Sequence, residues 1–260
     1  CRNADPVGDL MEGATHWKRR AALAGGALAV VGWVKGVPYL ASLGQPDFEF
    51  EEIPGLSPFR RLGGAGASTP GAAIFAGLES GPAETEADIE LKAFVRSNPC
   101  AAFFGADPSE TVPVAMFSDF ACPICRVMDD RLVDLEESHP GMFHIVRHQL
   151  PLLGVASEVA SRAVLAADIQ GEYRKMHARL MRTPAVTDER FVASIAKSLD
   201  LDADKLLEDM QSDAILRRLK LSAAIAQVFG FFGTPAFAVG RTVFMGSLPS
   251  NSLRKLIEQE

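Results

Sequence analysis

The pattern of apolar and polar positions is clearest after residue 108. Short apolar runs at 111–117 and 142–150 predict β-strands, because they are brief and bounded by turn residues. Between them, apolar residues at helical spacing follow Cys122 and end at the turn of residues 138–141. A longer amphipathic pattern at 157–181 predicts one helix, whose apolar face consists of Val159, Ala163, Ala166, Tyr173, Met176 and Leu180.

The rest of the pattern predicts a block of helices, then two short strands and a final helix. The expected ranges are 187–198 (beginning at Thr187 or Asp188), 202–210 and 213–229 for the helices, 236–239 and 242–245 for the strands, and 250–257 for the last helix. This order predicts an α/β fold, in which a small mixed sheet carries helices on its faces. The helical block, about 155–229, is expected to be an insertion between the two halves of the sheet.

A basic cluster precedes an apolar run near the start of the sequence. Residues 18–20 (Lys-Arg-Arg) are followed by an uncharged run at 21–34, and the apolar character continues weakly to about residue 43. This order is typical of a signal anchor or transmembrane segment at 21–43, with a cytoplasmic tail at 1–20. A cleaved export signal, including one of the twin-arginine kind, and a buried soluble helix are the alternatives.

Residues 44–107 are expected to form a Gly- and Pro-rich linker with one short helix. Chain-breaking residues recur from Gln45-Pro46 to Gly81-Pro82 and leave little room for regular elements. Apolar residues in this stretch, such as Phe59, are expected to dock parts of it on a folded surface. The pattern at 84–97 predicts an amphipathic helix that ends near Asn98-Pro99.

Charge and cysteine content narrow the possible functions. The chain has 260 residues and a formal net charge of -7. Nucleic acid is therefore not an expected partner, since phosphate binding needs clustered Lys and Arg. The four cysteines are too few to staple a chain of this length, and two of them form a C-x-x-C motif.

The spacing of Cys122 and Cys125 suits redox chemistry. Cys122 is expected at the first turn of a helix, where unpaired N–H groups and the helix dipole stabilise a thiolate and lower its pKa. Pro123 fits the first helical position, whose N–H has no partner in a helix. Cys125 returns to the same side one turn later, within reach of a disulfide. Cys122 is therefore the expected nucleophile and Cys125 the resolving cysteine, with Ile124 shaping the site.

A C-x-x-C pair is also half of many zinc sites. Such a site needs a second compact pair of ligands. The available donors Cys100, His139, His144, His148 and His177 do not form one. A purely structural disulfide across four residues would restrict the unfolded chain little. The pair is therefore predicted to be a redox-active Cys122–Cys125 disulfide, with no metal and no further cofactor.

A second motif, GTPAFAVG at 233–240, lies far along the chain. Its proline directly precedes a strand-like run, so it belongs at a strand start or edge and is a candidate for a cis peptide bond. An isolated Thr-Pro is more often an ordinary turn. Together with FSDFACPIC at 117–125, the stretch PLLGVAS at 151–157 and the helical insertion, this motif resembles the DsbA-like thiol:disulfide oxidoreductases over roughly residues 108–260.

The resemblance implies a thioredoxin fold with an inserted helical domain. It also implies that Pro235 is a cis-proline facing the cysteines, and that Thr234 and Pro235 align extended substrate through the backbone. The sequence departs from many relatives at Met116, where they bury an acid that helps to move a proton. Asp119 is expected on the exposed approach to the helix, and Cys100 is expected to be a buried small residue.

The leading functional hypothesis is a monomeric oxidase that introduces disulfides into exported proteins. The chain is expected in the bacterial inner membrane with its catalytic domain in the periplasm, or free in the periplasm if the signal is cleaved. Its expected partners are unfolded or cysteine-containing exported proteins and, from the resemblance, a membrane redox partner that reoxidises it. The alternatives are an isomerase or reductase of the same fold, a copper-handling protein that uses the two thiolates, and a binding module that no longer cycles.

Overall fold

The computed structural model describes residues 48–63, 84–105 and 110–260. All the elements discussed below belong to one compact unit, Glu49–Glu260. The predicted cytoplasmic tail and membrane segment, 1–20 and 21–43, lie outside the described residues. Among the residues that are described, no helix has the length and apolar character needed to cross a membrane.

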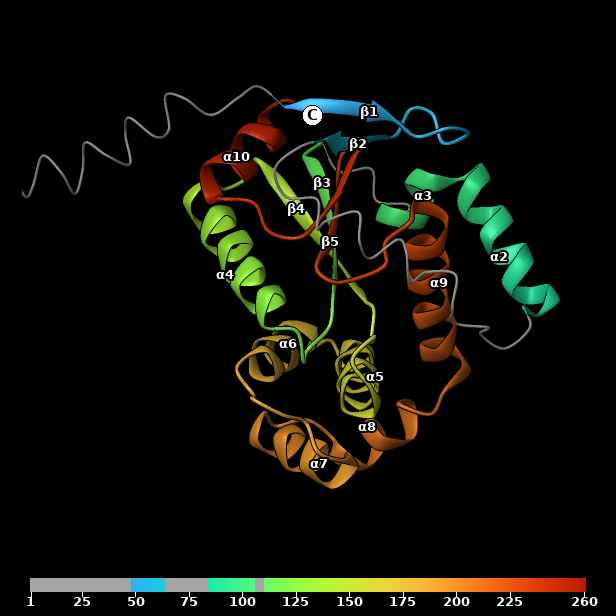
Figure 1. Ribbon diagram of the computed structural model, residues 1–260. Helices are drawn as coiled ribbons and strands as arrows, with labels where there is room; N and C mark the ends of the chain where they lie inside the picture. The colour runs from blue at the N-terminus through green and yellow to red at the C-terminus, as the bar shows by residue number, and fades with distance from the viewer. Residues whose placement is uncertain (1–47, 64–83, 106–109) are drawn as a thin grey trace, which may run out of the picture. The chain divides into compact units, whose positions relative to one another are not determined.

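A mixed sheet of six strands lies at the centre of the described part of the chain (Figure 1). The strand order is β1-β2-β6-β5-β3-β4. Strand β3 pairs in parallel with the edge strand β4 and antiparallel with β5, so that Met116 lies between Arg147 and Phe237. The strands are β1 (Glu49–Glu52), β2 (Arg60–Gly63), β3 (Val112–Ser118), β4 (Phe143–Gln149), β5 (Ala236–Val239) and β6 (Thr242–Met245).

Helices cover both faces of the sheet, as the sequence predicts for an α/β fold. Figure 1 shows α4 (Pro123–Ser138) and α10 (Ser250–Glu258) on one face. The opposite face carries α2 (Glu86–Ser97), α3 (Pro99–Phe104) and α9 (Asp213–Phe229). A buried aromatic cluster packs against α3 and α9, and its members include Phe59, Phe103, Phe117, Phe229 and Phe231.

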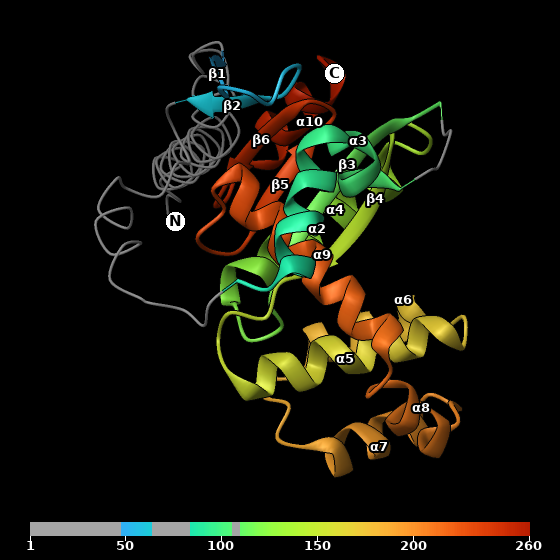
Figure 2. The ribbon, with the colours of Figure 1, turned by 90° about the vertical axis from the view of Figure 1, so that its right-hand side faces the viewer.

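The predicted helical block lies between β4 and β5 in the chain. Its members before α9 are α5 (Val155–Ile169), α6 (Tyr173–Met181), α7 (Glu189–Ser198) and α8 (Ala203–Asp209), which Figure 2 shows grouped beyond one end of the sheet. They share an apolar core of their own, which includes Val164, Met176, Leu180, Ile195 and Leu206. Asp188 and Asp202 cap the starts of α7 and α8, which explains why the sequence places these boundaries well.

The single helix expected at 157–181 is wrong, because the structure has α5 and α6 there. Gly171 has a φ of +77° after the end of α5, and its N–H donates to the carbonyl of Asp168. The next N–H, from Glu172, donates to Ala167, which completes a helix-ending turn that favours glycine. The apolar pattern runs across this break because α5 and α6 bury their faces in the same core.

The expectation of few regular elements at 44–82 also needs correction. Strands β1 and β2 form an antiparallel pair, and β2 joins the sheet in parallel with β6. Phe59 docks as expected, since only 3% of it is exposed and its ring lies 5.3 Å from that of Phe103. The sequence pattern does not predict helix α3, because a proline after the helix at 84–97 indicates a stop. Pro99 instead occupies the first turn of this short helix.

Candidate active site

Both cysteines of the C-x-x-C motif lie where β3 passes into α4. Cys122 is the N-cap of α4, with its backbone extended (φ -82°, ψ 115°). Its sulfur accepts a hydrogen bond from the N–H of Cys125 at 3.3 Å. Both residues are free thiols, Cys122 is 6% exposed and Cys125 is fully buried. The predicted position of Cys122 at the start of a helix is therefore confirmed.

The two thiols differ in acidity because they share hydrogen bonds unequally. The hydrogen bond from the Cys125 thiol lowers the pKa of Cys122 to about 6 despite its burial. Smaller contributions come from hydrogen bonds with the backbone of Cys125, with Thr234 and with the backbone of Ile124. The same bond to Cys122, together with burial, raises the pKa of Cys125. At neutral pH the arrangement favours a thiolate at Cys122 and a protonated thiol at Cys125.

The Thr-Pro motif lies directly beside this pair. The peptide bond between Thr234 and Pro235 is cis, as the resemblance implies. The Cys122 sulfur lies 3.5 Å from the carbonyl oxygen of Thr234, although the two residues are 112 positions apart in sequence. The carbonyl of Pro235 accepts from the N–H of Gly246, which follows β6. The structure thus brings Cys122, Cys125, Thr234 and Pro235 together at one end of the sheet.

Asp119 is buried, and its predicted position on an exposed approach is wrong. None of its surface is exposed. Its carboxylate accepts from the N–H of Ala121 at 2.8 Å and from the Ser157 hydroxyl at 2.6 Å. It also accepts from the N–H groups of Leu152 and Leu153 at 2.8 and 2.9 Å. The expectation failed because three of these partners come from the loop before α5 and from its first turn, which the local sequence around Asp119 does not reveal.

Arg126 follows the second cysteine and bridges two parts of the fold. Its guanidinium donates to the carbonyl of Phe120, in the turn before Cys122, at 2.8 Å. It also donates to the carbonyl of Thr183, in the loop after α6, at 2.8 Å. The residue therefore ties the catalytic turn to the helical block.

The position at which many relatives bury an acid is occupied by the fully buried Met116, while an acid lies nearby on α4. Asp129 is 5% exposed and accepts from Arg147 on β4 at 3.1 and 3.0 Å. Burial raises the pKa of Asp129 more than Arg147 lowers it. His177 on α6 lies 3.7 Å from the same carboxylate, and burial followed by the nearby Arg147 lowers the pKa of His177 to about 3. Sequence reasoning missed this cluster because its members lie on three separate elements.

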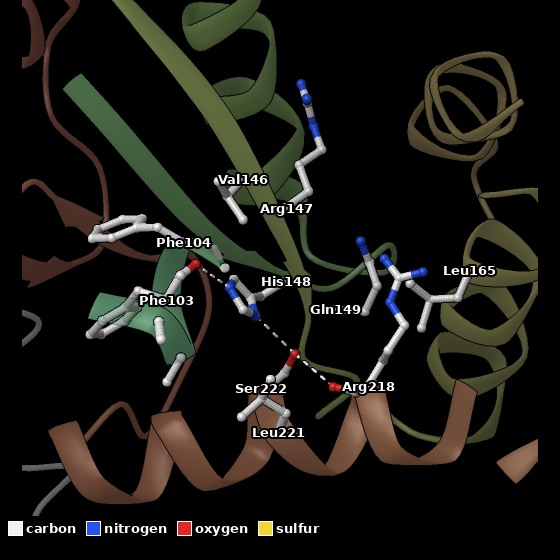
Figure 3. Close-up of a pocket in the computed structure, with 13 residues that line it drawn as sticks. Phe103, Phe104, Val146, Arg147, His148, Gln149, Leu165, Arg218, Leu221 and Ser222 are labelled. Carbon is white, nitrogen blue, oxygen red and sulfur yellow. Dashed lines mark hydrogen bonds between the residues drawn. The ribbon is translucent and has the colours of Figure 1, made fainter. Parts of the chain in front are cut away.

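His148, one of the spare donors considered for zinc, has two partners within the protein (Figure 3). Its Nε2 donates to the carbonyl of Phe103 at 2.8 Å, and its Nδ1 lies 3.2 Å from the Ser222 hydroxyl. Burial lowers the pKa of His148 to about 4, so the ring is neutral at pH 7. It borders a cavity of about 210 Å³ between α3, β4 and α9 and holds these elements together.

Other donors considered for zinc are not gathered around the cysteine pair. Within the ranges that the structure describes, no three His, Cys, Asp or Glu side chains are grouped as a metal site would require. Cys100 is exposed on α3, so the expectation that it is buried is wrong.

Exposed apolar side chains project from the three segments that meet at Cys122. Ile124 lies between the two cysteines, Leu152 and Leu153 lie on the loop bound to Asp119, and Phe232 lies two residues before Thr234. Their exposed fractions are 50%, 50%, 55% and 46%. Since exposed large apolar side chains favour contact with other chains, these residues make the segments next to the cysteine pair a candidate contact surface.

Comparison with known families agrees with this geometry. The family described as DSBA-like thioredoxin domain matches residues 113–258, which include the C-x-x-C motif, the helical block and the Thr-Pro motif. The chain belongs to this family. It therefore has a thioredoxin-like α/β fold, and it is a thiol:disulfide oxidoreductase of the DsbA family.

Two solved structures and one curated protein illustrate the relationship. The chain is similar to a thioredoxin-like oxidoreductase from Silicibacter pomeroyi DSS-3, with 30% identity, 61% of this chain and 95% of that chain covered, and a TM-score of 0.57. It also shares its fold with the thiol-disulfide exchange protein alpha-DsbA2 from Wolbachia pipientis, with 21% identity, coverage of 68% and 99%, and a TM-score of 0.57.

The curated protein is the Na(+)/H(+) antiporter NhaA 3 from Salinispora tropica, 31% identical over 133 residues that make up 49% of this chain and 20% of the antiporter. The chain thus spans about a fifth of the length of the curated relatives it matches.

Proposed function

We propose that this DsbA-family chain is an oxidase that introduces disulfides into exported proteins. The observation that supports this most directly is the low pKa of Cys122, about 6, beside a Cys125 thiol whose pKa is raised. A stabilised Cys122 thiolate stabilises the reduced form of the pair, so the disulfide form gives up its oxidising equivalents readily.

The proposed reaction begins with a Cys122–Cys125 disulfide and a substrate that carries two thiols. A substrate thiolate attacks the sulfur of Cys122, the bond between Cys122 and Cys125 breaks, and Cys125 leaves as a thiolate that takes up a proton. A second substrate thiolate then attacks the substrate sulfur of the mixed disulfide. Cys122 leaves as a stable thiolate, the substrate has lost two electrons, and the enzyme holds them as a dithiol.

The backbone beside Cys122 is proposed to align the substrate. The carbonyl of Thr234 lies 3.5 Å from the Cys122 sulfur, so an extended chain placed along Thr234 and Pro235 brings its cysteine to the reacting sulfur. Backbone pairing of this kind reads few side chains. The exposed apolar side chains near the site can contact the apolar segments that unfolded proteins expose; these side chains are Ile124, Leu152, Leu153 and Phe232.

The location and partners are proposed from the sequence. A basic cluster before an apolar run at 21–43 supports an inner-membrane anchor or an export signal that delivers the domain to the periplasm. A membrane redox partner is proposed to accept the two electrons and restore the disulfide. The curated relatives are named as Na(+)/H(+) antiporters, and this chain spans about a fifth of their length. Ion transport is therefore not proposed for this chain.

The reduction potential of the Cys122–Cys125 pair tests the proposal. The full chain is equilibrated with glutathione buffers, and its free thiols are counted after alkylation. A potential of about -120 to -180 mV supports an oxidase, whereas one near -270 mV supports a reductase. Cys125→Ser is expected to trap a mixed disulfide with substrate, Cys122→Ser is expected to be inactive, and the exposed Cys100 provides a matched control, Cys100→Ser. If no reversible couple appears, the oxidoreductase mechanism is refuted, and bound copper would then favour the metal-handling alternative.

A further inference from the structure

Asp119 is a fully buried acid beside the active site that takes no part in the proposed exchange of sulfur bonds. It lies three residues before Cys122, and none of its surface is exposed. An ionised carboxylate offers about four lone-pair positions on its two oxygens. Four donors contact these oxygens at 2.6 to 2.9 Å, so the acceptor capacity of the side chain is filled. An uncharged amide could not replace it, since an amide nitrogen cannot accept.

The four donors belong to two separate parts of the chain. Ala121 and Ser157 donate to Oδ1, one from the catalytic turn and one from the first turn of α5. Leu152 and Leu153 donate to Oδ2 through their backbone N–H groups. The carboxylate therefore fastens the turn that carries Cys122 to the loop that presents the exposed side chains of Leu152 and Leu153.

The main chain of Asp119 reaches both cysteines. Its carbonyl accepts from the N–H of Cys122 at 3.0 Å. A backbone hydrogen bond with Asp119 acts on the Cys125 thiol, where it partly offsets the influences that raise the pKa of that thiol. Any movement of Asp119 thus changes the surroundings of both sulfur atoms.

We propose that Asp119 is a positioning residue, which holds the catalytic cysteines in place and sets them against the apolar loop at Leu152 and Leu153. This inference rests on the proposed function and adds a determinant of it. Asp119 does not touch substrate. It acts through the backbone of the catalytic turn on Cys122, and through Leu152 and Leu153 on the surface that substrate contacts.

The negative charge of Asp119 and its role in holding the turn have opposite effects on the pKa of Cys122, and this makes the inference testable. If Asp119 acted on Cys122 only as a nearby negative charge, removing that charge would favour the thiolate and lower the pKa of Cys122. If Asp119 holds the turn, its loss loosens the N-cap contacts from the backbone of Cys125 and Ile124, which stabilise the thiolate, and the pKa of Cys122 rises.

The experiment compares Asp119→Asn with the unaltered full chain by the rate at which iodoacetamide alkylates Cys122 between pH 4 and 9. We expect the midpoint of the rate profile to rise by about one pH unit, and the rate at pH 5 to fall about tenfold. Ser157→Ala removes one donor from the same carboxylate without changing the charge, and it should move the midpoint in the same direction by less. If Asp119→Asn does not fold, Ser157→Ala decides the question.

Asp188→Ala serves as the matched control, because it removes a solvent-exposed helix cap at the start of α7, away from the turn that carries Cys122. It should lower stability and leave the alkylation profile unchanged. An unchanged or lowered midpoint in Asp119→Asn, or in Ser157→Ala alone if only that variant folds, overturns the inference. Failure of the proposed function would appear differently, since the unaltered chain would then show no reversible dithiol–disulfide couple.

Discussion

The reduction potential of the Cys122–Cys125 pair should change its dependence on pH near pH 6. Below pH 6 both thiols are protonated, so reducing the disulfide takes up two protons with two electrons. Above pH 6 Cys122 is a thiolate, while Cys125, whose pKa is raised, keeps its proton. Each proton coupled to a two-electron reduction contributes about 30 mV per pH unit. We therefore expect the potential to fall by about 60 mV per pH unit below pH 6 and by about 30 mV above it.

The size of the effect at neutral pH follows from the same pKa. With a pKa of about 6 instead of 9.0, ionisation of Cys122 favours the folded dithiol about tenfold at pH 7, which corresponds to about 1.4 kcal/mol or about 30 mV. Because the folded pKa is the lower one, this stabilisation is absent below pH 6, grows as the pH rises and is complete only above pH 9. Above pH 9 the raised pKa of Cys125 opposes it, since an unfolded Cys125 would then ionise.

The assay equilibrates the Cys100→Ser chain with glutathione buffers between pH 4.5 and 8. The mixtures are quenched in acid, alkylated and separated by mass. Thiolate absorbance in the ultraviolet gives an independent midpoint, which Cys122→Ser should abolish. A slope that stays at about 60 mV per pH unit up to pH 8 would show that Cys122 remains protonated, and the reasoning from its hydrogen bonds would then be refuted.

Three further predictions concern contacts that support the site, each measured by urea unfolding. Asp129→Asn should lower the free energy of unfolding by about 3 kcal/mol, because Arg147 loses its buried partner, and adding Arg147→Met should recover part of this loss. Arg126→Met should cost about 1 to 2 kcal/mol through two lost contacts to carbonyls. Phe59→Ala should cost about 3 to 5 kcal/mol, since its ring packs against that of Phe103.

Matched controls separate these effects from the general consequences of substitution. Asp130→Asn changes an exposed neighbour of Asp129 and should alter the free energy of unfolding by no more than about 0.5 kcal/mol. Phe94→Ala removes a ring that is 43% exposed and should cost far less than Phe59→Ala. Equal losses in the two phenylalanine variants would contradict the assignment of Phe59 to the core.

The arrangement of the cysteine pair was predictable because it depends on local sequence. Two cysteines at the start of a helix, with proline after the first, specify an N-cap thiol and a second thiol one turn later. Helix starts at Asp188 and Asp202 were equally readable, since each aspartate caps a helix within three residues of itself. Where the determining contacts lie within one turn of chain, the sequence alone was sufficient.

The features that sequence reasoning missed depend on distant partners. Asp119 looked exposed because its donors Leu152, Leu153 and Ser157 lie more than thirty positions away. Strands β1 and β2 have only four residues each, and short strands between turn residues gain their stability from neighbours in the sheet. No pattern within residues 48–63 indicates that β6 is such a neighbour.

The pairing of β2 with β6 has a consequence for how the chain folds. Arg60 lies opposite Thr242, and its guanidinium also contacts Thr242 and Glu260, at separations of 182 and 200 residues in sequence. Closing so long a loop gives this region a high contact order, which slows folding. During synthesis β2 must wait for its partner until almost the whole domain has left the ribosome. Strand β2 is therefore translated long before it can form its native contacts with β6.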